Sequence, residues 1–186
     1  MPEHRFSLHT VRRIDRFTQL CGHAIAWLLL FMVAIESLVV ILRYGMDLGS
    51  IAAQEAVTYL HATVFLLGAG YTLQRDEHVR VDIFYRRFTA RRKAWVNLFG
   101  YLLFLLPVCC YIIWESWAYV AQAWSIKETS ADSGGIAGVY LLKTLIPLFA
   151  LLLIVQGLAE ALRSWLVLRG QPWPPAEAAP GGSTSM

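Results

Sequence analysis

Long apolar runs separated by short polar stretches dominate the chain. Four runs reach the roughly 20 residues that a helix needs to cross a bilayer, and most charges lie between them. A soluble helix bundle would instead place charges every few residues to solvate one face of each helix. The pattern therefore predicts an all-α integral membrane protein with four transmembrane helices, at Leu20–Leu42, Ile51–Leu73, Val96–Val120 and Tyr140–Trp165.

The composition agrees with a membrane protein. Of 186 residues, 57% are hydrophobic and 16% are charged, against about 25% charged residues in a soluble domain. The first apolar run is longer than the core of a cleaved signal peptide, about 7 to 15 residues, so we expect it to be retained. We expect an amino-terminal arm (1–19), a membrane domain (20–169) and a disordered Pro- and Gly-rich tail (170–186).

The basic residues predict the orientation. Most of the 16 Lys and Arg residues lie in the arm, after the second run and at the carboxyl end. Basic residues near helix ends are held on the cytoplasmic side of a membrane. Both termini and the middle segment are therefore predicted to be cytoplasmic, and the net charge of +3 requires no nucleic-acid partner.

The basic middle segment resembles an interfacial helix lying on phospholipid headgroups. On a helical wheel Phe84, Phe88 and Trp95 share a face, and Arg86 and Lys93 point away from it. Arg91 falls on the apolar side and would have to snorkel. A plain basic loop that only fixes topology is the alternative. The predicted membrane-surface anchor residues are Phe84, Arg86, Arg87, Phe88, Arg91, Arg92, Lys93 and Trp95.

Ionisable residues inside the apolar runs are the candidates for function or partner binding. A carboxylate inside a spanning helix costs about 2.5 to 3.5 kcal/mol on insertion scales, which singles out Glu36, His61 and Glu115. A wet interface near the outer tryptophans would also accommodate Glu115. Glu55 opens the second run, where the helix dipole favours a carboxylate, so a capping role is the alternative for it.

The chemistry of these residues disfavours an enzyme. Paired axial haem ligands need one depth, yet His23 lies near one end of its run and His61 near the middle. The chain has no nucleophile constellation, metal-ligand spacing or phosphate loop, so no catalytic residue, cofactor or metal is expected. Two classes remain, namely an accessory membrane subunit and a small proton-coupled exporter that uses Glu36 as its carrier.

Several segments resemble a known family. They are Arg43-Tyr44 closing the first helix, Gln54-Glu55 opening the second, and FLLGAGYTLQRDEHVRVDIFY from Phe65 to Tyr85. In this run Gly68, His78 and Asp82 are the most specific residues. From about Ile14 to Arg169 the chain resembles the small, DctQ-like membrane subunit of tripartite ATP-independent periplasmic (TRAP) transporters.

The resemblance implies a division of labour in the bacterial cytoplasmic membrane. A periplasmic binding protein captures an organic acid, and a large membrane subunit carries it across by a movement driven by a sodium gradient. The small subunit is attached to the static scaffold of the large one. By this resemblance Arg43, Glu55, Gly68, His78 and Asp82 are subunit-interface or stability residues; Glu36, His61 and Glu115 join them as buried polar candidates.

Overall fold

The described part of the chain is mostly helical. The computed structural model describes residues 3–75, 85 and 87–170, with side chains from Val11 onward. Four stretches are long and apolar enough to cross a membrane, so the predicted all-α architecture with four spanning helices is confirmed. The elements are α1 (Glu3–Gly45), α2 (Ile51–Gln74), α4 (Ala90–Phe99), the π-helix η1 (Gly100–Leu105), α5 (Leu106–Ser125) and α6 (Val139–Leu168).

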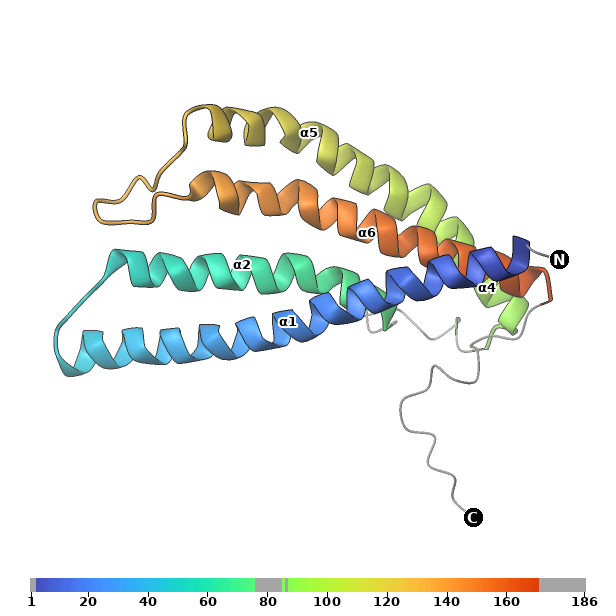
Figure 1. Ribbon diagram of the computed structural model, residues 1–186, viewed down its shortest axis with the longest axis horizontal. Coiled ribbons are helices and arrows are strands. Elements are labelled where there is room, and N and C mark those ends of the chain that lie inside the picture. The colour runs from blue at the N-terminus through green and yellow to red at the C-terminus, as the bar shows by residue number, and fades with distance from the viewer. Residues whose placement is uncertain (1–2, 76–84, 86, 171–186) are drawn as a thin grey trace, which may run out of the picture.

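The helix α6 is the central element of the bundle. It contacts α1, α2, α4 and α5, whereas α1 packs mainly along α2 (Figure 1). In the most apolar window of α6, 39% of the residues are buried, against 6% in α1. We call the end with the starts of α1 and α4 the terminal end, and the end with turns 46–50 and 126–138 the loop end.

Helix α1 is much longer than its apolar run. It begins at Glu3, well before the predicted start at Leu20, because residues 3–19 contain no proline or glycine to stop a helix. Its 43 residues correspond to about 65 Å at 1.5 Å per residue, twice the roughly 30 Å hydrocarbon core. Val11 and Thr18 are buried in the extension, so the amino-terminal arm packs as part of the bundle.

The third span runs from Ala90 to Ser125 without a break, beginning earlier than predicted. Thr89 caps it by accepting a hydrogen bond from the Arg92 N–H at 3.4 Å. Within it, the Leu106 N–H bonds to Tyr101 O, the longer spacing of a π-helix. Pro107 follows directly and lacks an N–H, and a proline disturbs helical hydrogen bonding in the turn before it, where this irregularity lies.

Close helix approach depends on glycine at two positions. A Cβ atom on Gly22 of α1 would lie 2.7 Å from Tyr71 Cγ of α2, and one on Gly157 of α6 would collide with the Leu105 side chain. At Gly68 the nearest atom would be Ile25 Cγ2 at 3.9 Å, an ordinary contact. Of Gly22 and Gly68, Gly22 is therefore the one at which α1 and α2 leave no room for a side chain.

Candidate functional site

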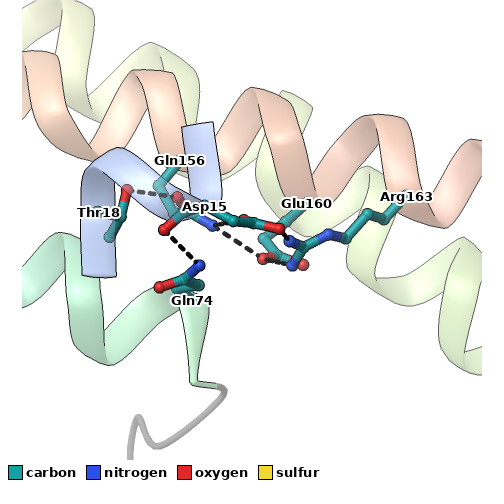
Figure 2. Close-up of polar contacts among 6 residues, drawn as sticks. All are labelled: Asp15, Thr18, Gln74, Gln156, Glu160 and Arg163. Atoms are coloured by element: carbon teal, nitrogen blue, oxygen red, sulfur yellow. Dashed lines mark hydrogen bonds and ion pairs between the residues drawn. The ribbon is translucent and has the colours of Figure 1, made fainter. Parts of the chain in front are cut away.

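A polar cluster ties three helices together at the terminal end, and we call it the terminal cluster (Figure 2). Spacings of three and four residues place the members from α1 on one face of that helix, and likewise those from α6. Their side chains meet between α1, α2 and α6 although up to 148 residues separate them in the chain. The members are Asp15 and Thr18 of α1, Gln74 of α2, and Gln156, Glu160 and Arg163 of α6.

Gln156 is the centre of this cluster and is only 1% exposed. Its Oε1 accepts a hydrogen bond from the Thr18 hydroxyl at 2.9 Å. Its Nε2 donates to Glu160 Oε1 at 3.1 Å, with a longer contact of 3.4 Å to Asp15 Oδ1. Both ends of the amide are therefore satisfied, as a buried polar group requires.

Arg163 supplies the positive charge. Its guanidinium bridges two carboxylates, pairing with Glu160 at 2.5 Å and with Asp15 through its other terminal nitrogen. The Asp15 pair joins α1 to α6, while Gln74 Nε2 donates to the Asp15 backbone carbonyl at 3.0 Å and joins α2. The cluster thus fixes the amino-terminal part of α1 against both neighbours.

Sequence reasoning identified only part of this cluster. The spacing of three residues between Glu160 and Arg163 predicts a helical pair, and that pair is present. Sequence reasoning did not find Asp15, Thr18 or Gln156 as partners. One signal was available, because Gln156, Glu160 and Arg163 follow the i, i+4, i+7 spacing of a single helix face in an otherwise apolar run.

A second polar group fixes the loop end, and Glu55 is its centre. The Glu55 carboxylate accepts hydrogen bonds from the Ser130 hydroxyl and from the Ile136 N–H, the latter at 2.6 Å. The N-cap of α2 is Ser50, which accepts from the Ala53 N–H at 3.3 Å. The Glu55 side chain therefore holds the turn 126–138 against α2, a contact that the capping alternative does not include.

The same turn is held to the spanning helices by charge and aromatic contacts. Lys143 of α6 pairs with Glu128 at 2.5 Å. Trp124 donates its indole N–H to the Thr144 hydroxyl at 2.8 Å, and the Lys127 ammonium lies 4.4 Å from the centre of the Trp124 ring. The loop end is thereby fastened to α2, α5 and α6.

Between α1 and α2 an open groove of about 370 Å³ contains Glu36 and His61. Both side chains are exposed, and His61 stacks on Phe65 with ring centroids 6.4 Å apart. Within the described part of the chain, neither makes a hydrogen bond or ion pair. The neighbouring Ser37 hydroxyl donates to its own helix at Val33 O, which leaves Glu36 as an unpaired carboxylate facing outward.

The structure does not bring the eight predicted interface residues into one site. Glu36 and His61 share the groove, and Glu55 lies in the loop-end contacts. Arg43 and Glu115 are exposed, on α1 and α5 respectively. Gly68 makes ordinary contact with Ile25, and His78 and Asp82 lie outside the described residues.

The predicted anchor residues fall largely at the start of the third span. Arg91, Arg92, Lys93 and Trp95 are in α4, which continues through η1 into α5. Arg87 is exposed and Phe88 half-buried, just before the Thr89 cap. Among the described residues these side chains therefore precede or begin a spanning helix. Phe84 and Arg86 lie outside the described residues, as do residues 171–186 of the predicted tail (170–186).

Comparison with known proteins gives the family. The model of the DctQ component of tripartite ATP-independent periplasmic transporters matches residues 32–167, from the middle of α1 to the end of α6. No curated protein sequence matches the chain. The match includes the groove and the loop-end contacts of Glu55, whereas Asp15 and Thr18 lie before it. The chain therefore belongs to the DctQ family, and it is a multi-pass inner-membrane component of a TRAP transporter rather than an enzyme.

Proposed function

We propose that the chain is the scaffold subunit of a TRAP transporter that takes up an organic acid with a sodium gradient. The observation that carries the proposal is the family match over residues 32–167. Its partners would be a large membrane subunit and a periplasmic binding protein. The choice of substrate would belong to these partners, because the groove beside Glu36 and His61 is open to the outside of the bundle.

The contacts at both ends of the bundle support a static role. The terminal cluster joins α1, α2 and α6, and the Glu55 contacts join α2 to the turn between α5 and α6. Helices that are fastened at both ends resist sliding past one another. A small subunit whose helices resist sliding would hold its position while a mobile part of the large subunit moves.

The terminal end would face the cytoplasm and the loop end the periplasm. Arg12, Arg13 and Arg16 lie near the start of α1, and Arg91 and Arg92 begin the third span at the same end. Basic residues beside spanning helices favour the cytoplasmic side. The loop end has three described basic residues, Arg43, Lys127 and Lys143, of which Lys127 and Lys143 contact aromatic rings or a carboxylate.

Reconstitution tests the scaffold role. In liposomes with a sodium gradient, the purified chain alone is expected to give no uptake, because transport requires the large subunit. Uptake is expected when the large subunit and the loaded binding protein are added, and it should be lost when the chain is omitted. Sodium- or proton-coupled flux through the chain alone would contradict the proposal and favour the exporter.

Glu36 tests the interface role of the groove. As an unpaired carboxylate on an exposed face, it is proposed to accept a hydrogen bond from the large subunit. Glu36→Gln should keep much of this bond and weaken assembly by about 1 to 2 kcal/mol, or roughly 5- to 30-fold in affinity. Glu36→Leu, which removes every acceptor, should weaken it further. The measurement is co-purification of the two subunits.

Transport measured on the same variants separates the two roles of Glu36. An interface residue lowers uptake only as far as complex formation falls. A proton carrier loses its titrating group in Glu36→Gln. An intact complex without uptake would therefore refute the interface role.

A further inference from the structure

We propose that a cavity between α4 and α6 at the terminal end binds the phosphate group of a membrane phospholipid. The cavity is separate from the Glu36 groove and has a volume of about 390 Å³, within the range of about 300 to 1,000 Å³ for ligand pockets. The site needs only the inner-membrane location of the chain, and it does not rest on the proposed transport role.

Two donors on α4 line the cavity. The Lys93 ammonium lies 5.2 Å from the centre of the Tyr85 ring and forms no ion pair with any described residue. Asn97 accepts the Tyr85 hydroxyl at Oδ1, at 3.0 Å, which orients the amide and leaves its Nδ2 group as a donor. Tyr85 thus positions a cation and an amide on the same wall.

The facing wall comes from α6. Ser164 is 7% exposed, and its hydroxyl has no hydrogen-bond partner in the described part of the chain although it lines the cavity. Glu160 also lines this wall, but Arg163 and Gln156 already bind its carboxylate. An ammonium, an amide N–H and a hydroxyl therefore face one space, a donor set suited to a phosphate oxygen cluster.

The depth of the cavity favours a lipid as the source of the phosphate. Ser164 lies about 38 Å along α6 from Val139 at 1.5 Å per residue, which is beyond the roughly 30 Å hydrocarbon core. Exposed Trp95, Phe99 and Trp165 surround this level, as aromatic side chains do at membrane interfaces. A phosphate at this depth belongs to the headgroup of a phospholipid, and the acyl chains of that lipid extend along the helices.

Lipid binding to the delipidated, detergent-purified full chain tests the site. Native mass spectrometry with phosphatidylglycerol is expected to show one retained lipid per chain, and diacylglycerol, which lacks the phosphate, should not be retained. Lys93→Gln and Ser164→Ala should each weaken retention by about tenfold, since hydrogen bonds to charged groups are the stronger ones. Thermal denaturation without lipid checks that both variants are folded.

Arg92→Gln is the matched control. Arg92 is the exposed neighbour of Lys93 on α4 and does not line the cavity, so its replacement should leave retention unchanged. Equal weakening by Arg92→Gln would refute the site in favour of general attraction to a basic surface. Retention of diacylglycerol would refute it in favour of apolar contact. Displacement of the lipid by millimolar inorganic phosphate would assign the site to free phosphate and refute the lipid proposal.

Discussion

Replacing Arg163 with methionine is expected to destabilise the purified chain by about 3 kcal/mol. The guanidinium bridges Asp15 and Glu160, and its side chain is 14% exposed. Removing one partner of a buried ion pair leaves an uncompensated charge and costs about 3 to 5 kcal/mol. Because Asp15 is the acidic contact from α1, the substitution should also release the amino-terminal part of that helix.

Two measurements on the Arg163→Met variant test this prediction. Unfolding in mixed detergent micelles reports the free energy, and maleimide labelling of Cys21, which is half-buried in α1, reports release of the helix. The labelling needs a Cys110→Ser background because Cys110 is exposed. Arg169→Met is the control, since Arg169 is exposed and lies against Trp165. Equal stability and labelling in the two variants would show that the terminal cluster does not hold α1.

Gly22→Ala is expected to separate α1 from α2 near the terminal end and to destabilise the chain by about 1 to 3 kcal/mol, the usual cost of overpacking. The added Cβ would lie 2.7 Å from Tyr71 Cγ. This atom is the root of the ring, so it cannot move without moving α2 or changing the Tyr71 rotamer. One methyl group is therefore sufficient to disturb the helix pair.

The matched control for Gly22→Ala is Gly68→Ala. Its Cβ would meet only Ile25 Cγ2 at 3.9 Å, and alanine favours a helix over glycine by up to about 1 kcal/mol. Gly68→Ala should therefore be neutral or stabilising in the same thermal denaturation experiment. The double variant Gly22→Ala/Tyr71→Ala should lose less than its two single changes together. If Gly22→Ala and Gly68→Ala behave alike, the close contact at Tyr71 is not important for stability.

The spanning helices could be predicted because the length of an apolar run must match the thickness of the bilayer. The second predicted span, Ile51–Leu73, differs from α2 by one residue at its end. The first differs by many residues, since hydropathy marks where α1 lies in lipid and not where its backbone hydrogen bonding begins. The absence of proline and glycine from residues 3–19 permits the start at Glu3, whereas the burial of Val11 and Thr18 in the bundle depends on distant partners that local composition does not encode.

The polar contacts could be predicted only in part. Within α6, helical spacing places Glu160 beside Arg163, and the pair is present. The partners Asp15 and Ser130 are far along the chain from the residues they contact, so their roles depend on how the helices cross. The close contact at Gly22 could not be predicted either. It depends on the ring of Tyr71, which lies opposite Gly22 on another helix.

The contact between Asp15 and Arg163 spans 148 residues, which has a consequence for biosynthesis. At about 5 to 20 residues per second, roughly 7 to 30 s pass between synthesis of the two side chains. During that interval the first helix is already made, whereas Arg163, the partner of its Asp15 carboxylate, is not. The first helix therefore completes its contacts only when α6 is made, and any membrane chaperone or insertase acting on the chain before then would encounter the terminal cluster without its α6 members.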